Sequence, residues 1–143
     1  MLAGSHDTEM TMDGIVTKLS PLNARDTMDR LEAAIRAKGL AVFARIDHAA
    51  GAAQAGLALR PTELLVFGSA LSGTPLMQAK QTIGIDLPLK ALVWMDETGK
   101  VWLSYTDPHW IVSRHGEGAS MNERASAMTS TLETLARIAT EPA

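Results

Sequence analysis

Residues 89–105 read LKALVWMDETGKVWLSY, and this stretch predicts a β-hairpin. Its two halves are rich in β-branched and aromatic residues, and the loop between them contains Gly99, as short hairpin connections do. Trp94 and Trp102 flank the loop, and we expect them to stack across the two strands. We interpret both as core or interface residues rather than as a platform for a ligand.

Two longer segments predict helices that could cover such a sheet. Apolar residues recur at helical spacing over residues 23–38, where Asn23 is suited to the N-cap. They recur again after Ser120, which forms the capping box S-x-x-E with Glu123. The order of elements therefore predicts an α+β fold, with a mainly antiparallel sheet covered on one face by two long helices.

The remaining elements are shorter. Further strands are expected at residues 14–19, 40–46 and 64–67. The last of these runs is apolar throughout, which is typical of a strand buried on both faces. Short helices or turns are expected at residues 49–56, 74–82 and 107–114.

The composition excludes several classes of function. The 143 residues contain no cysteine, which rules out thiolate nucleophiles, disulfides, zinc ribbons and iron–sulfur clusters. The net charge is -3, whereas nucleic-acid-binding proteins usually carry an excess of basic residues, so we expect no nucleic-acid partner. No apolar run approaches the roughly 18–20 residues of a membrane span, so no membrane partner is expected either.

The N-terminus gives expectations about domain limits and location. Residues 1–12 include Gly4-Ser5-His6, which resembles a vector remnant, and we expect this segment to be a tag remnant or disordered. Residues 13–143 are then expected to form one α+β domain. No basic stretch followed by an apolar core marks a secretory signal, so we predict a cytoplasmic location, with a processed periplasmic form as the alternative.

Asp47 and His48 follow the strand expected at residues 40–46. A carboxylate and an imidazole at a strand end can bind a metal ion or transfer a proton. The alternative is a turn in which the Asp47 side chain accepts backbone hydrogen bonds and His48 is solvated. We favour the turn because the other histidines offer no partner by spacing: His109 and His115 are six residues apart and do not share a helical face.

The segment GSALSGTPLM at residues 68–77 is a second candidate. Thr74 and Pro75 predict a helix N-terminus, whose free N–H groups could bind a phosphate, carboxylate or sulfate. The segment lacks the glycine-loop motifs of nucleotide-binding proteins, and we favour an ordinary capped turn. His48 with Met77 could also ligate heme or copper, which we do not favour, and the sequence does not identify a cofactor.

Five motifs follow one another along the chain: RIDHAAGA at 45–52, RPTELLVFG at 60–68, GTPLM at 73–77, DLP at 86–88 and the segment 96–105. Taken in this order, they resemble the signature of domain-of-unknown-function family 302. The resemblance covers about residues 14–116. It implies a compact β-α-β(4)-α fold of the kind grouped with the TATA-binding protein, and it makes a homodimer plausible. It implies no activity, because a shared topology does not carry function with it.

Polar and sulfur-bearing positions in these motifs, together with Gly73 of the turn before Thr74, define a candidate ligand site. The set is Asp47, His48, Glu63, Gly73, Thr74, Met77, Asp86 and Tyr105. We expect His48, Glu63 and the Gly73-Thr74 turn to lie close together beside the sheet, with His48 and Glu63 as the candidate metal ligands.

Three functions remain open at this point. The first, which we favour, is a domain that binds a small molecule, an anion or a metal. The second is an enzyme of small substrates, with His48 as acid–base and Glu63 or Asp47 orienting it. The third is a dimeric scaffold or accessory protein without catalysis.

Overall fold

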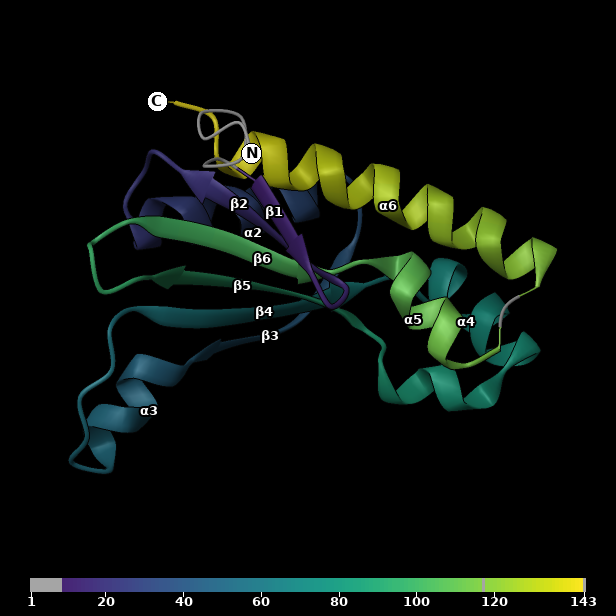
Figure 1. The fold of residues 1–143 in the computed structure, drawn as a ribbon, viewed down its shortest axis with the longest axis horizontal. Helices are drawn as coiled ribbons and strands as arrows, with labels where there is room; N and C mark the ends of the chain where they lie inside the picture. The colour runs from purple at the N-terminus through teal and green to yellow at the C-terminus, as the bar shows by residue number, and fades with distance from the viewer. Residues whose placement is uncertain (1–8, 117, 143) are drawn as a thin grey trace.

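In a computed structural model, which describes residues 9–116 and 118–142, the chain forms a six-stranded antiparallel sheet (Figure 1). The strands are β1 (Glu9–Met12), β2 (Ile15–Ser20), β3 (Ala41–Asp47), β4 (Thr62–Gly68), β5 (Leu89–Met95) and β6 (Val101–Thr106). Their order across the sheet is β1-β2-β6-β5-β4-β3, and each neighbouring pair is antiparallel. The predicted hairpin is β5–β6, in which Trp94 and Trp102 are register partners whose rings stack with centroids 6.3 Å apart.

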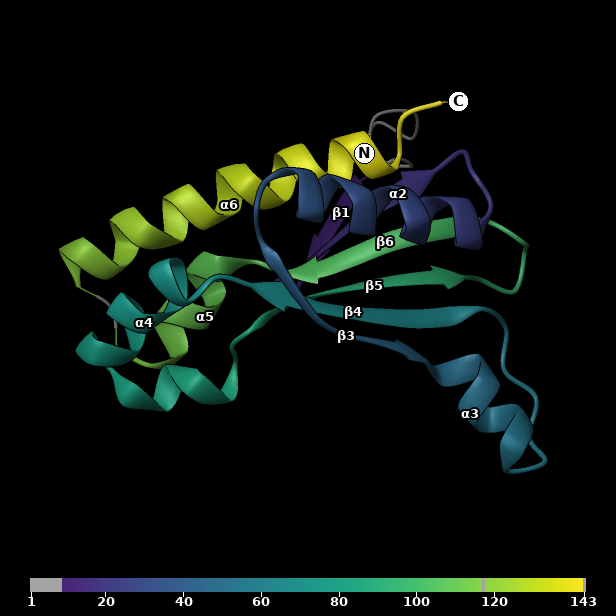
Figure 2. The same cartoon turned by 180° about the vertical axis from the view of Figure 1, so that it is seen from behind.

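Two long helices, α2 (Ala24–Ala37) and α6 (Ala119–Ala139), lie side by side over one face of the sheet (Figures 1 and 2). Each helix buries its predicted apolar stripe, for example Met28 and Ile35 on α2 and Leu135 on α6. These side chains pack with Leu65 and Phe67 of β4 in one hydrophobic core. The α+β fold with two long helices on one face is therefore confirmed.

Among the described residues, four short helices lie at the two ends of the sheet. Helix α3 (His48–Gln54) projects from one end, while α4 (Ala70–Ala79) and α5 (Pro108–Arg114) gather at the opposite end (Figures 1 and 2). A 3₁₀ helix, η1 (Gln81–Ile85), follows α4 and contacts it. The chain segments that hold the sequence candidates are thus divided between two ends of the molecule.

Two helices begin earlier than the sequence predicts. Helix α4 starts at Ala70 rather than at Thr74, because the Ser69 hydroxyl accepts the Leu71 N–H at 3.1 Å and Ser69 becomes the N-cap; Pro75 consequently lies inside the helix. Helix α6 starts at Ala119 with Gly118 at the N-cap and no side-chain cap. The predicted capping box is not formed, since Ser120 already lies within the first turn.

In the part of the chain that the structure describes, no helix covers the second face of the sheet, so β4 is buried on one face only. Its alternate residues Leu64 and Val66 are partly exposed, whereas Leu65 and Phe67 on the helix side are fully buried. The prediction of a strand buried on both faces is wrong at this point. The run at residues 64–67 is apolar throughout because the second face of the sheet is itself partly apolar. Ile46 and Trp94 also lie on that face.

Strand β1 adds a sixth strand to the five expected from the sequence. Residues 1–8 of the expected tag segment lie outside the described residues, while residues 9–12 pair with β2. Asp13 and Gly14 connect the two strands, with φ of 51° and 79°, the positive values that a type I′ hairpin turn requires. That residues 13–143 form one independent domain stays a prediction.

Candidate functional site

Asp47 and His48 occupy the junction between β3 and α3. The Asp47 carboxylate accepts the backbone N–H of Ala50 at 2.9 Å and serves as the N-cap of α3. His48 is the first residue of that helix, and its side chain is exposed. The local geometry is that of a capped helix start, with the carboxylate engaged by the backbone and not by the imidazole.

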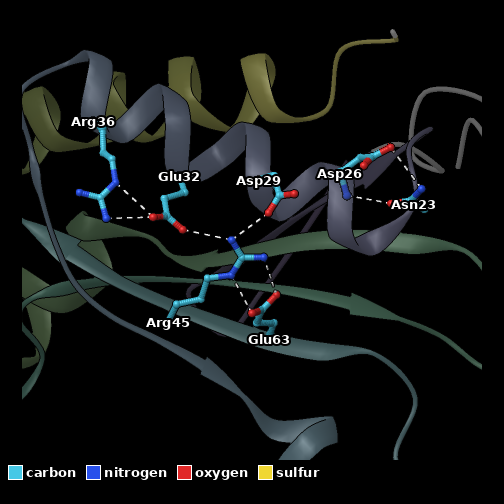
Figure 3. Close-up of polar contacts among 7 residues, drawn as sticks. All are labelled: Asn23, Asp26, Asp29, Glu32, Arg36, Arg45 and Glu63. Carbon is cyan, nitrogen blue, oxygen red and sulfur yellow. Dashed lines mark hydrogen bonds and ion pairs between the residues drawn. The ribbon is translucent and has the colours of Figure 1, made fainter.

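Glu63 is the register partner of Asp47 across β3 and β4, but it binds Arg45 (Figure 3). The guanidinium donates to both Glu63 oxygens, at 2.7 and 3.1 Å, and its Nη1 donates to Asp29 at 2.9 Å and Glu32 at 3.1 Å. Arg36 of α2 completes this group by donating to Glu32. The cluster joins the edge strand β3 to helix α2.

The charges of this cluster stabilise one another. Hydrogen bonds from Arg36 and Arg45 lower the pKa of Glu32 below its ordinary value. The hydrogen bond with Glu63, followed by those with Asp29 and Glu32, raises the pKa of Arg45 although burial opposes this. Glu63 is therefore committed to a structural ion pair, and we assign the cluster a role in stability.

The structure does not bring His48 and Glu63 near the Gly73-Thr74 segment. The five residue steps from Glu63 to Gly68 span about 16 Å at the usual strand rise, and Gly73 and Thr74 lie beyond, inside α4. Met77 shares that far end, so it is separated from His48 as well. Within the part of the chain that the structure describes, no three His, Asp or Glu side chains gather in a metal-binding geometry.

A cavity of about 350 Å³ opens between α4 and the first half of α6. Gly73, Thr74 and Met77 from the predicted set line it, together with Leu87 and Met128. Most of the lining surface is apolar, because β3, β5 and α6 present aliphatic and aromatic side chains there. The sequence therefore located one wall of this cavity, although the helix N-terminus it predicted at Thr74 is absent.

Polar groups are few in this cavity. Ser69, Ser72, Thr74 and Thr131 bring hydroxyls, and Arg124 of α6 is the one cationic side chain among the described residues of the lining. Among residues 9–116 and 118–142, no carboxylate forms an ion pair with Arg124. An apolar cavity with one available guanidinium suits a ligand that carries a single negative charge on a hydrophobic body.

Asp86 takes part in a separate cluster at the same end of the molecule. It follows η1, and its Oδ2 lies 2.5 Å from Nε2 of His115, just after α5. Nδ1 of His115 lies 2.9 Å from Oγ1 of Thr82 in η1, and Arg114 donates to the second Asp86 oxygen at 3.3 Å. His115 therefore has the carboxylate contact that the sequence predicts for His48.

Tyr105 lies in the core of β6 beneath α6. Burial raises the pKa of its hydroxyl to about 12, and the carboxylates of Glu133, Glu9 and Asp107 act in the same direction. The phenol therefore stays protonated near neutral pH and can serve as a hydrogen-bond donor but not as a phenolate. It is not grouped with the other predicted residues.

Sequence reasoning missed Arg45, Thr82, His115 and Arg124. Each contributes through contacts between residues far apart in the chain, for example the 33 positions that separate Thr82 from His115. No motif spacing marks such a pair. A weak signal existed for Arg45, which stands directly before Ile46-Asp47-His48 in the motif at 45–52.

The chain is similar to three curated proteins from Brucella. It is 46% identical over 126 residues to "Fluoride-specific ion channel FluC 1" of Brucella suis, to a protein of the same name of Brucella abortus, and to "Fluoride-specific ion channel FluC 2" of Brucella melitensis. The match covers 88% of this chain but 50% of the first relative and 47% of the other two. The chain thus spans about half the length of the curated relatives it matches.

The cytoplasmic location predicted from the sequence is wrong in the light of these relatives. All three are named as ion channels, and an ion channel works within a membrane. In residues 9–116 and 118–142, no helix has the length and apolar character to cross a bilayer.

A solved structure and a family model agree on the family. "Crystal structure of uncharacterized conserved protein DUF302 from Bacillus stearothermophilus" matches with a TM-score of 0.80 and 17% identity, over 90% of this chain and 98% of that one, which supports the fold. The model of the family "Domain of unknown function DUF302" matches residues 16–137. The resemblance seen in the sequence is therefore confirmed, and the chain belongs to the DUF302 family.

Proposed function

We propose that this domain binds a small amphipathic anion, such as a short-chain carboxylate, in the cavity between α4 and α6. The observation that carries the proposal is the composition of the cavity lining. Its volume of about 350 Å³ falls within the range of small-molecule sites. Met77, Leu87 and Met128 favour an acyl or aryl group, while Arg124 favours a carboxylate, which its guanidinium can hold through two hydrogen bonds.

This ligand class accounts for both parts of the lining. A bare inorganic anion would leave the apolar walls of the cavity in contact with water. A neutral hydrocarbon would leave the Arg124 guanidinium without an anionic partner. Hydroxyls such as those of Ser72 and Thr74 can add hydrogen bonds to the charged end of the ligand. The proposal accordingly combines the small-molecule and anion alternatives.

Calorimetric titration with octanoate and 1-octanol tests the proposal. We expect Arg124→Gln to weaken octanoate binding about tenfold, which is about 1.4 kcal/mol, because one charge-assisted contact is lost. Binding of 1-octanol should not change in this variant. Ala127→Phe, which places a ring at an exposed lining position of α6, should weaken both ligands.

Two exposed positions supply the controls. Arg137→Gln removes a charge from the other end of α6, and Ala33→Phe adds a ring to α2 away from the cavity. Both should bind octanoate like the wild type. The proposal fails if wild-type protein does not bind octanoate, or if Arg124→Gln and wild type bind it equally.

A second candidate function is a role linked to fluoride, favoured by the names of the Brucella relatives. Fluoride itself would then be the anion that Arg124 attracts. The same titration separates the candidates when sodium fluoride is added as competitor, with sodium chloride at equal concentration as the control. Displacement of octanoate by fluoride but not by chloride would favour the fluoride-linked function. If fluoride does not displace octanoate, the fluoride-linked function is excluded.

We also propose that the chain forms the homodimer that the family resemblance makes plausible. Its interface would be the face of the sheet that the two long helices do not cover. Ile46 and Ile15 on this face are 42% and 49% exposed, and the stacked Trp94 and Trp102 lie between them. We expect Ile46→Asp to raise the dimer dissociation constant at least tenfold in sedimentation equilibrium, because it would bury a charge. Leu57→Asp, at an exposed position outside the face, is the control.

A further inference from the structure

Thr82, His115 and Asp86 form a continuous chain of side chains. They come from two places in the sequence: Thr82 and Asp86 lie in and directly after η1, and His115 lies directly after α5. His115 uses both ring nitrogens, Nε2 toward the Asp86 carboxylate at 2.5 Å and Nδ1 toward the Thr82 hydroxyl at 2.9 Å. The order is hydroxyl, imidazole, carboxylate.

The direction of the hydrogen bonds follows from the chemistry of the groups. An ionised carboxylate only accepts, so Nε2 of His115 must carry the proton and donate to Asp86. In the neutral ring Nδ1 is then the acceptor, and the Thr82 hydroxyl donates to it. Arg114 also donates to Asp86, which holds the carboxylate from a second side. The imidazole is thereby fixed in the tautomer that can remove the proton of Thr82.

The imidazole and the hydroxyl-bearing residue of this cluster differ in exposure, as a base and its nucleophile would. The His115 side chain is 8% exposed, whereas Thr82 lies at the surface. A purely structural tie between η1 and α5 would need the hydrogen bonds but not an accessible hydroxyl. Here the base is largely buried, while the residue that it activates is exposed.

We propose that Thr82 is a nucleophile that accepts an acyl group from an ester, with His115 as its base and Asp86 as the positioning residue. Oγ1 of Thr82 forms a bond to the ester carbonyl carbon while its proton moves to Nδ1 of His115. The carbon–oxygen bond to the leaving group then breaks, and the departing alkoxide takes this proton. The products are acyl-Thr82 and one alcohol. The cavity between α4 and α6 contributes no group to this step.

The test uses p-nitrophenyl acetate on the whole chain, with release of p-nitrophenol followed by absorbance and the acetyl group located by peptide mass spectrometry. We expect acetyl-Thr82 in the wild type and in Thr82→Ser, and none in Thr82→Val. His115→Asn should slow the reaction about a hundredfold, which is the size of a general-base contribution, and Asp86→Asn should slow it similarly. Thr82 is exposed, so its two variants test the proposal even if His115→Asn fails to fold.

The chain contains a matched internal control. Ser126 Oγ lies 3.2 Å from Nε2 of His109, and among the described residues no carboxylate contacts the other nitrogen of that ring. Ser126 should therefore remain unacetylated. Arg137→Gln, at an exposed position of α6 outside both the cavity and the Thr82 cluster, should be acetylated at the wild-type rate. The proposal is overturned if the wild type yields no acetyl-Thr82, or if Asp86→Asn and His115→Asn yield it at the wild-type rate.

Discussion

Replacing Gly14 with alanine is expected to lower the free energy of unfolding by about 3 kcal/mol, the sum of a backbone and a steric cost. Gly14 has a φ of 79°, in the left-handed region that costs other residues about 1–2 kcal/mol. A Cβ atom there would lie closer to Cγ of Trp110 than two carbon atoms can approach. The turn between β1 and β2 would have to move away from α5, where the Asp107 N–H also donates to the Gly14 carbonyl at 2.7 Å.

Urea denaturation of three variants separates the two costs. Gly99 has a φ of 89°, and an added Cβ would meet no atom within 4 Å, so Gly99→Ala should cost only the backbone part, about 1 kcal/mol. In the double variant Gly14→Ala/Trp110→Ala the clash with the Trp110 ring is absent. Its loss of unfolding free energy should therefore be smaller than the sum of the losses in the two single variants, by the steric part of the cost. Equal costs for Gly14→Ala and Gly99→Ala would show that the Trp110 contact does not constrain the turn.

Replacing Arg45 with methionine is expected to lower the free energy of unfolding by about 2 kcal/mol near neutral pH, between the values for exposed and buried ion pairs. The Arg45 side chain is 28% exposed and binds Glu63, Asp29 and Glu32. Without it, three carboxylates would face one another between β3 and α2. Arg36→Met is the control, because that side chain is 60% exposed and pairs with Glu32 alone; its cost should stay below about 0.5 kcal/mol.

Acid should reduce the effect of Arg45→Met. The pKa of Glu32 is lowered in the folded chain, so its contribution to stability is present above the ordinary value of 4.5 and is lost as the pH falls through the folded value. Arg45 has a raised pKa and stays charged throughout this range. Urea denaturation at about pH 7 and pH 3 should therefore give a smaller difference between variant and wild type in acid. A difference that is constant with pH would contradict an electrostatic origin.

Most of the fold could be predicted from the sequence because its local signals agree with its tertiary structure. The apolar stripes of α2 and α6 predicted buried faces, and the β5–β6 hairpin has a loop that suits it. The start of α4 was predicted too late, since Pro75 is typical of a first helical turn while Ser69 provides an earlier cap. Strand β1 is not predicted, although Asp13-Gly14 is a strong hairpin signal, because the residues before it resemble a tag.

The candidate site was harder to predict for a physical reason. Motif residues mark places where the backbone turns, and several such residues serve the turn itself, as Asp47 does by capping α3. The groups that converge on a reactive or charged position come from distant segments, as Thr82 and His115 do. Gly73, Met77 and Asp86 were useful guides because they lie on the elements that border the cavity and the Thr82 cluster.

Helix α3 has a consequence for where this chain can change in length. No residue of α3 is buried, and the helix projects from the end of the sheet where β3 and β4 are antiparallel neighbours (Figure 2). Two residues are enough to join such strands, so the segment between them is dispensable to the core. Insertions, deletions, new chain termini or a tether to another domain can be accommodated there, at the opposite end from the cavity and Thr82.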